Sequence, residues 1–197
     1  MQLILASSSP RRKELLSHAG FIFSAVNHQL REHASSASSQ SAPDLARSLA
    51  LAKARSVAPN FSQALVLGAD TLVALGQRVI GKPRDRQHAR QILTTLSGTT
   101  HQVITALALI SAPDGPTLLE HETTSLTMAQ LSTRQIDRYL RTGLWRGKAG
   151  AYALQKDDAF IINIQGSFSN VVGLPLELFE RMLRQLLPTK LLSEIKP

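Results

Sequence analysis

The sequence predicts a mixed α/β fold, in which helices cover a sheet with both parallel and antiparallel strands. Apolar runs of strand length alternate with amphipathic helical segments through most of the 197 residues. The turn signals Gly76-Gln77 and Pro113 to Pro116 join consecutive extended segments and so indicate hairpins. Alternation favours parallel pairing and hairpins require antiparallel pairing, so we expect a mixed sheet. The length suits one domain, 1–197, whose last residues, 188–197, are expected to fray.

The N-terminal half begins with a short buried strand over residues 3–6. A helix is expected from Pro10, because Ser9 and Pro10 suit the N-cap and first helical positions. The other elements expected here are an exposed Ser/Ala-rich loop over 33–42, a helix over 43–58, strands over 64–68, 71–75 and 78–80, and a helix over 83–96.

The C-terminal half continues the alternation. A strand over 101–110 and a return strand over 118–128 flank the proline turn, and Ser132 caps a helix that runs to about Arg141. The last elements expected are a strand over 159–164 and an amphipathic helix over 174–187.

Composition narrows the class of protein. The net charge is +8 and the pI is near 10.4, a balance that suits a polyanionic partner. Aromatic residues make up only 5%, so stacking platforms for single-stranded nucleic acid are poorly supplied. The absence of cysteine excludes disulfides and thiolate catalysis. No apolar run approaches the ~18 residues of a membrane span and no leader is evident, so we expect a cytoplasmic protein with no membrane association.

The start of the first helix carries the wrong charge for a purely structural role. A helix N-terminus is electropositive and favours acidic residues, yet this one carries Arg11, Arg12 and Lys13. Exposed N–H groups, the hydroxyls of Ser7 and Ser9 and two guanidinium groups together suit a bound phosphate. The alternative is a solvated basic helix end that happens to follow serines.

Three further charged residues are candidates for a cleft. Asp70 follows the predicted strand 64–68, where a carboxylate can hold a metal or activate water; the alternative is an ordinary turn aspartate. Lys53 lies on the apolar face of its predicted helix, so its ammonium either snorkels to solvent or enters a cleft. Lys82 directly precedes the helix expected from Pro83, although a solvated lysine is equally consistent.

A glycine-rich segment near position 150 is the last candidate. Lys148 lies between Gly147 and Gly150, and such small residues permit close approach of backbone to a ligand. Gln155 offers both a donor and an acceptor, as a nucleobase edge requires. Tight packing of loops against the sheet explains the same residues equally well.

Together these residues indicate a nucleoside triphosphate and its metal. Arg11, Arg12, Lys53, Lys82 and Lys148 suit a polyanion, and Glu32 with Asp70 suits a divalent cation. The sequence contains neither a P-loop nor a dinucleotide-binding glycine fingerprint. None of the six histidines shows the His-x-x-x-His spacing of a zinc site on a predicted helix.

In order and spacing, these segments resemble the Maf family of nucleotide pyrophosphatases. The matching blocks are residues 5–12, 53–54, 68–71, 81–83, 96–98, 148–152 and 172–176. The resemblance implies an elongated, two-lobed fold with a central cleft, related to the inosine-triphosphate pyrophosphatases. It also implies hydrolysis of a nucleoside triphosphate to the monophosphate and pyrophosphate with a divalent metal such as Mg, Mn or Co, and a homodimer.

The resemblance also implies roles for single residues. Asp70 matches the proton acceptor, Lys53 and Lys82 match cleft lysines, and the segment from Ser7 to Arg12 matches the phosphate-binding loop. Arg11, Thr71 and Gln155 resemble the dTTP/UTP branch of the family; the 7-methyl-GTP branch is the alternative. The chain departs from the family pattern at Arg31-Glu32, where an acidic pair is usual, and at 156–158, where glycine usually follows the glutamine.

A hypothesis of another class is a basic protein that binds nucleic acid or regulates septation without turnover. It accounts for the net charge of +8 but gives no role to Asp70, Glu32 or Gln155. We therefore expect a free nucleotide as substrate and no stable nucleic-acid partner.

Overall fold

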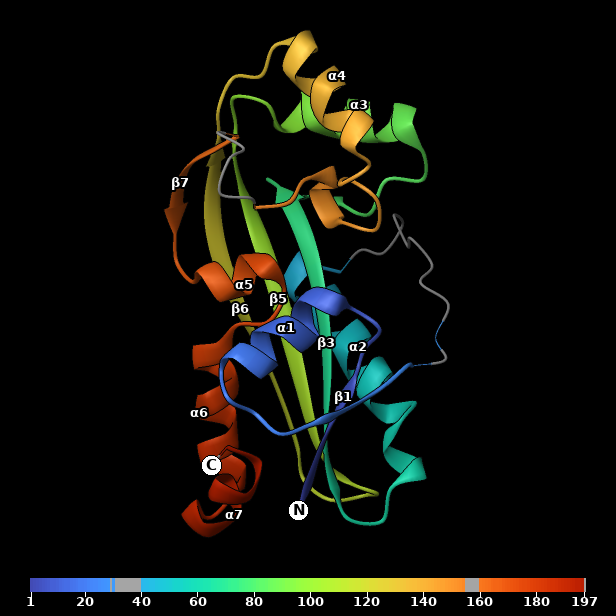
Figure 1. The fold of residues 1–197 in the computed structure, drawn as a ribbon, viewed down its shortest axis with the longest axis vertical. Helices are drawn as coiled ribbons and strands as arrows, with labels where there is room; N and C mark the ends of the chain where they lie inside the picture. The colour runs from blue at the N-terminus through green and yellow to red at the C-terminus, as the bar shows by residue number, and fades with distance from the viewer. Residues whose placement is uncertain (29, 31–39, 155–159, 197) are drawn as a thin grey trace.

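The computed structural model describes residues 1–28, 30, 40–154 and 160–196, in which one seven-stranded sheet runs along the long axis of the molecule (Figure 1). The strand order is β2-β1-β3-β5-β6-β7, and β4 pairs with β3 outside this path. Pairing of β1 with β2 and β3 is parallel and the remaining pairs are antiparallel, which confirms the predicted mixed sheet. The strands are β1 (Gln2–Ala6), β2 (Ser24–Val26), β3 (Ala64–Leu75), β4 (Arg78–Ile80), β5 (Thr100–Ala112), β6 (Thr117–Met128) and β7 (Ile161–Gln165).

Helices cover both faces of the sheet and one of its ends (Figure 1). The α-helices are α1 (Pro10–His18), α2 (Ala42–Arg55), α3 (Arg86–Leu96), α4 (Thr133–Thr142), α5 (Phe168–Val172), α6 (Leu176–Leu186) and α7 (Thr189–Ile195), and the short 3-10 helices are η1 (Ala58–Asn60) and η2 (Ala149–Ala151). Among the described residues, none of these helices has the length and apolar character needed to cross a membrane.

Strand alternation assigns each face of the sheet to a different group of helices. On β1, Ile4 and Ala6 pack with the alanine-rich face of α2, whereas Leu3 and Leu5 pack with α1, α6 and α7 on the opposite face. A third apolar cluster at the far end joins the sheet to α3, α4 and η2. In Figure 1 the helices that cover the two faces lie around one half of the sheet, and α3, α4 and η2 lie around its other half.

β3 is one continuous strand of 12 residues, so the expected break after Gly68 is wrong, and Asp70 lies within the strand rather than at its end. Instead, the strand that pairs with one edge of β3 changes along the length of β3. β1 pairs with β3 as far as Gly68, and β4 pairs with it only from Val73 onward. β5 pairs along the whole of the other edge from Ala64 to Ala74. Within the described chain, residues 69–72 therefore have one edge without a strand partner.

Two predicted helices begin at other residues than expected, and the N-cap of each explains where it starts. α3 begins at Arg86 rather than Pro83, since the carboxylate of Asp85 accepts a hydrogen bond from the backbone N–H of His88 at 2.7 Å. Lys82 consequently lies in the connection from β4 and not directly before a helix. α2 begins at Ala42, where the Ser41 hydroxyl accepts from Asp44 N–H at 3.3 Å.

The C-terminal residues form α7, so the expectation of a frayed tail over 188–197 is wrong for the part of it that the structure describes. Ile195 is 1% exposed and joins the apolar cluster that contains Phe21. The carbonyl of Ile195 accepts a hydrogen bond from Ile22 N–H at 2.8 Å, and Glu194 pairs with the amino terminus. Burial of one isoleucine and these contacts hold the segment in place.

Smaller differences concern short elements. The sequence pattern did not predict β2 or α5, each at most five residues long, and the closing helix α6 begins at Leu176 rather than Leu174. β7 covers 161–165, while the predicted start of that strand at 159 and most of the predicted loop 33–42 lie outside the described residues.

Candidate active site

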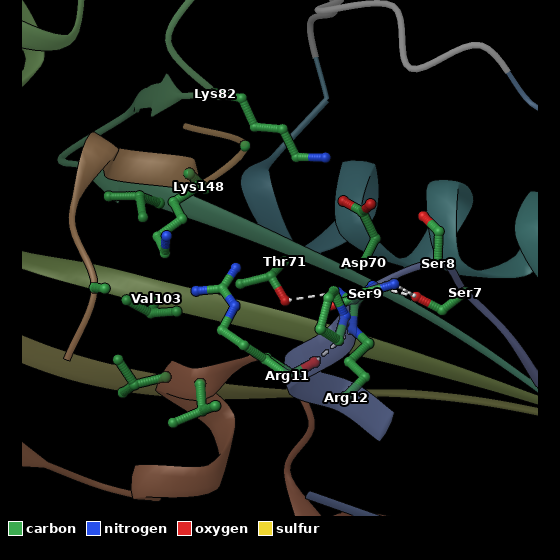
Figure 2. Close-up of a pocket in the computed structure, with 18 of the residues that line it drawn as sticks. Ser7, Ser8, Ser9, Arg11, Arg12, Asp70, Thr71, Lys82, Val103 and Lys148 are labelled. Atoms are coloured by element: carbon green, nitrogen blue, oxygen red, sulfur yellow. Dashed lines mark hydrogen bonds between the residues drawn. The ribbon is translucent and has the colours of Figure 1, made fainter. Parts of the chain in front are cut away.

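A cleft of about 510 Å³ opens at the unpaired edge of β3 (Figure 2). Asp70 and Thr71 come from β3 itself, while residues 7–12 follow β1 and Lys53 projects from α2. The far rim consists of Lys82 and residues 146–149, from the part of the molecule that contains η2. Nine residues that the sequence singled out line this one cleft: Ser7, Ser9, Arg11, Arg12, Lys53, Asp70, Thr71, Lys82 and Lys148.

The loop from β1 into α1 is organised around the buried hydroxyl of Ser7. Helix α1 begins at Pro10 as predicted, but the Ser9 side chain makes no capping hydrogen bond and the first turn contains no acidic residue. Ser7 Oγ accepts from Ser9 N–H at 3.2 Å and from Arg12 at 3.3 Å. The helix N-terminus therefore faces the cleft without a carboxylate from its own first turn, an arrangement that favours a bound anion.

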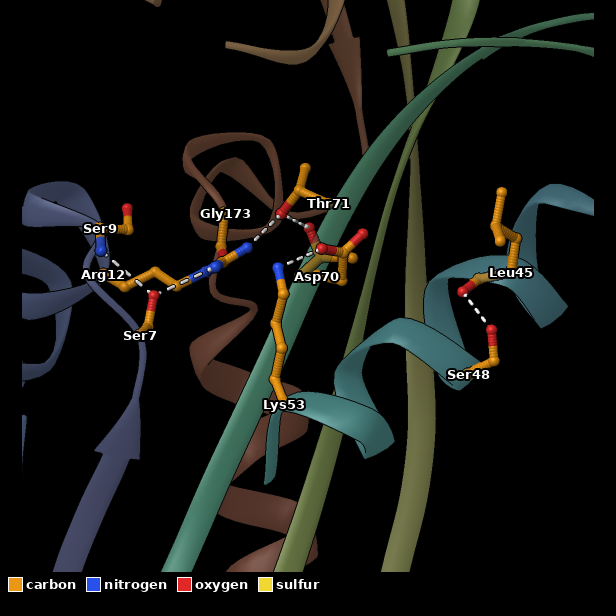
Figure 3. Close-up of polar contacts among 10 residues, drawn as sticks. Ser7, Ser9, Arg12, Leu45, Ser48, Lys53, Asp70, Thr71 and Gly173 are labelled. Atoms are coloured by element: carbon orange, nitrogen blue, oxygen red, sulfur yellow. Dashed lines mark hydrogen bonds and ion pairs between the residues drawn. The ribbon is translucent and has the colours of Figure 1, made fainter. Parts of the chain in front are cut away.

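Arg12 fastens this loop to the rest of the protein (Figure 3). Arg12 is 9% exposed, and its guanidinium donates to three acceptors: Gly173 O at 2.8 Å, Thr71 Oγ1 at 3.0 Å and Ser7 Oγ at 3.3 Å. The acceptors come from the turn after α5, from β3 and from the loop itself. Arg12 thus brings a buried positive charge into the cleft in a fixed orientation.

Lys53 and Asp70 form a buried ion pair, with Nζ 2.6 Å from Oδ1 (Figure 3). The Lys53 side chain is 4% exposed and that of Asp70 is 12% exposed. Asp70 lies on the β3 face that packs on α2, one residue away from Thr71 on the opposite face. Of the alternatives for Lys53, the structure shows the ammonium entering the cleft.

Two cations stand close together on the other side of the cleft, where Figure 2 shows Arg11 and Lys148 reaching toward the same space. Burial lowers the pKa of Lys148 from its usual value, and the nearby positive charge of Arg11 lowers it further. Burial also lowers the pKa of Arg11. Both shifts reflect the cost of burying positive charges in this cleft, a cost that a bound anion would reduce.

Arg146 is a cleft residue that the sequence analysis missed. It lies at the rim beside Gly147, and its guanidinium sits 5.2 Å from the centre of the Trp145 ring. Its position one residue before the glycine-rich segment was the available signal.

The cleft also has an apolar part, which the sequence analysis did not anticipate. Its lining side chains are those of Val73, Val103, Tyr152, Leu154 and Val171. The phenol of Tyr152 is held by a hydrogen bond of 2.8 Å to Nε2 of the buried His101. Val103 looked like an ordinary core residue of a strand, because alternation alone cannot distinguish a core from an apolar pocket wall.

Two predicted site residues, Glu32 and Gln155, lie outside the described residues. Among the described residues, no group of three His, Asp or Glu side chains gathers as a metal cage would require. One carboxylate, Asp70, stands in a cleft lined by cations. This fits Mg²⁺ and similar ions, which commonly use one or two carboxylates together with substrate phosphates.

A mixed α/β protein with a cationic cleft, a single described carboxylate and an apolar wall belongs to the class that binds phosphorylated organic anions. Residues 2–186 match the family model described as Maf-like protein, and the chain belongs to this family. It is 46% identical over 185 residues to the dTTP/UTP pyrophosphatase of Symbiobacterium thermophilum, with 93% of each chain covered. It is 44% identical over 189 residues to that of Moorella thermoacetica, covering 92% of this chain and 93% of the relative.

A solved structure matches more distantly. The nucleoside-triphosphatase / dITP/XTP pyrophosphatase from Mycobacterium abscessus is 15% identical, with a TM-score of 0.43, and the match covers 96% of this chain and 100% of that one. This likeness is too distant to bear on function.

Proposed function

We propose that the protein hydrolyses dTTP and UTP to the nucleoside monophosphate and pyrophosphate in this cleft. The main support is the cleft itself, in which six cationic side chains face one described carboxylate beside an apolar wall. The cations are Arg11, Arg12, Lys53, Lys82, Arg146 and Lys148. A nucleoside triphosphate combines the two features that such a site matches, a polyanion and a flat base.

The choice of dTTP and UTP has two supports. The relatives that cover nearly the whole chain at 40–46% identity are called dTTP/UTP pyrophosphatase. Arg11, Thr71 and Gln155 also resemble that branch. A glutamine amide donates and accepts, as the edge of uracil or thymine requires, whereas a glutamate in the 7-methyl-GTP branch only accepts.

In the reaction we propose, water attacks the α-phosphorus and the bond from this phosphorus to the bridging oxygen breaks. Asp70 accepts the proton of the water, and Lys53, 2.6 Å from its carboxylate, keeps it oriented. Arg11, Arg12 and Lys82 stabilise the charge that develops on the departing pyrophosphate. Asp70, with Glu32 as the resemblance implies, would hold a divalent cation, which supplies charge neutralisation and activation of water.

The resemblance further suggests that the enzyme acts as a homodimer on free nucleotides in the cytoplasm. No stable nucleic-acid partner is needed to explain the basic residues of the cleft, because the triphosphate of a free nucleotide already serves as their polyanionic ligand.

Pyrophosphate release from a nucleotide panel tests the proposal. We expect turnover with dTTP and UTP, and at least about ten-fold lower kcat/KM with 7-methyl-GTP, since one misplaced donor in a base-reading site costs this much or more. A higher kcat/KM for 7-methyl-GTP than for dTTP and UTP would place the protein in the 7-methyl-GTP branch of the family. Absence of turnover on the whole panel, with tight, salt-dependent DNA binding, would favour the non-catalytic hypothesis.

A further inference from the structure

A chain of hydrogen bonds runs from the cleft into the centre of the sheet. Arg12 donates to Thr71 Oγ1 at 3.0 Å, Thr71 Oγ1 lies 3.0 Å from Thr105 Oγ1, and Thr105 donates to the backbone carbonyl of Asn170 at 3.0 Å. Its four members belong to α1, β3, β5 and α5. Thr105 and Asn170 are fully buried, so this part of the chain is closed to water.

The direction of every bond in this chain is fixed. A carbonyl oxygen only accepts, so the single proton of Thr105 goes to Asn170. The Thr105 oxygen must then accept from Thr71, and Thr71 in turn accepts from the guanidinium of Arg12, which only donates. While these hydrogen bonds are formed, the Thr71 hydroxyl has no proton to donate to a nucleobase.

We propose that Thr105 is a positioning residue for Arg12, acting through Thr71. Thr71 then influences the substrate mainly by orienting the Arg12 guanidinium toward the phosphates. This inference rests on the proposed function, since it assumes that Arg12 meets a triphosphate.

The surroundings of Thr105 support a specific use of its hydroxyl. Val103 and Leu107, which share its face of β5, are buried and apolar, and a valine at position 105 would have nearly the same shape as the threonine. A buried hydroxyl is tolerated only when its hydrogen bonds are made, and here both run in the chain that ends at Arg12. Thr124 on β6 is a natural comparison: it is equally buried and accepts a hydrogen bond from the side-chain amide of Asn170, and its other hydrogen-bond partner is Ser167 rather than Thr71 or Arg12.

The test is a double-mutant cycle between Thr105→Val and Arg12→Met, with Thr105→Ser as the conservative variant and Thr124→Val as the matched control. We expect Thr105→Val to lower kcat/KM for dTTP by about 2- to 13-fold, the range for loss of a hydrogen bond between neutral groups, because Thr71 then loses the partner that holds it in place under Arg12. The Thr105→Ser variant, which keeps the hydroxyl, should retain most of the wild-type kcat/KM. In the Arg12→Met background Thr105→Val should add little, whereas the effects of Thr124→Val and Arg12→Met should multiply.

The inference is overturned if Thr105→Val and Arg12→Met act independently, or if Thr105→Ser is as damaging as Thr105→Val. Should Thr105→Val not fold, the same cycle with Thr71→Val and Thr71→Ser tests the same chain from its exposed end, with the same coupling expected. If the wild-type protein hydrolyses no nucleotide, the proposed function fails on its own. The cycle is then measured as the Kd for inorganic tripolyphosphate by calorimetry, where loss of coupling would overturn the positioning role.

Discussion

The Lys53–Asp70 ion pair combines burial with a place in the cleft. A buried pair contributes little net stability, because the attraction between the charges is offset by the cost of removing both from water. Removing one partner is costly, since the other charge is left buried alone. Its position in the cleft therefore supports the role proposed for Asp70 in the reaction. Mutation of one or both residues can separate the effect of the pair on stability from its effect on activity.

For Lys53→Met we expect a loss of about 3–5 kcal/mol in the free energy of unfolding, together with loss of activity. Lys53→Met combined with Asp70→Asn should regain much of the stability, because no buried charge remains, but none of the activity. Urea unfolding and pyrophosphate release measure the two quantities. A single variant as stable as the wild-type protein would show that the carboxylate does not depend on the lysine.

His101 makes the stability of the protein depend on pH. Burial lowers its pKa from 6.5 to about 4 in the folded protein, so the imidazole is neutral beside Tyr152. Between these pH values the unfolded chain binds a proton that the folded protein does not. The contribution of His101 to the free energy of unfolding is therefore complete above pH 6.5. It is lost as the pH falls toward 4, and this loss amounts to at most about 3 kcal/mol.

Replacing His101 by glutamine, which keeps a donor for Tyr152, should remove this dependence. Denaturant unfolding of wild-type and variant protein at pH 7.5 and pH 4.5 measures the difference, and exposed His18→Gln is the control. The same pH dependence in all three proteins would show that other groups cause it.

At the scale of elements, the approach of α2 to β3 sets the position of Lys53. A Cβ built on Gly68 would lie 2.3 Å from the carbonyl oxygen of Ala50 and 2.7 Å from the backbone nitrogen of Ala54. Glycine at this position and alanines along the helix allow the two backbones to meet closely. Lys53 is thereby brought within reach of Asp70.

Gly68→Ala should therefore push α2 away from the sheet, destabilising the protein by about 1–3 kcal/mol or more and lowering activity as the ion pair is disturbed. Gly81→Ala is the control for stability, because a Cβ there meets no atom within 4 Å. Thermal unfolding of both variants checks the prediction, and equal stability of the two would contradict the close approach.

Local signals predicted those elements whose ends are decided locally. Ser9-Pro10 marked the start of α1, and Ser132 caps α4 in a capping box with Gln135. β3 was divided in error because Gly68 and Asp70 are poor strand formers, whereas pairing with β5 along its whole length maintains the strand. The tail was expected to fray because no local pattern shows that Ile195 finds a place in the core.

At the scale of the whole molecule, the cleft is made by topology. β1 ends and β4 begins on the same edge of β3, and the cations come from segments spread between residues 11 and 148. The chemistry of each of these residues was visible in the sequence. The inventory of charges indicated one polyanion site for five of them, and the family resemblance implied the same cleft. The apolar wall that includes Val103 was not predicted, because side chains of a wall and a core look alike in sequence.

The central claim, that Asp70 drives hydrolysis of a pyrimidine nucleoside triphosphate in this cleft, is tested most directly by the rate of pyrophosphate release from dTTP in the Asp70→Asn variant. Asparagine keeps the shape of the side chain but is a very poor proton acceptor. We predict a fall in kcat of about 10²- to 10⁴-fold, with thermal unfolding showing that the variant remains folded. Near-normal release of pyrophosphate by folded Asp70→Asn protein would contradict the account.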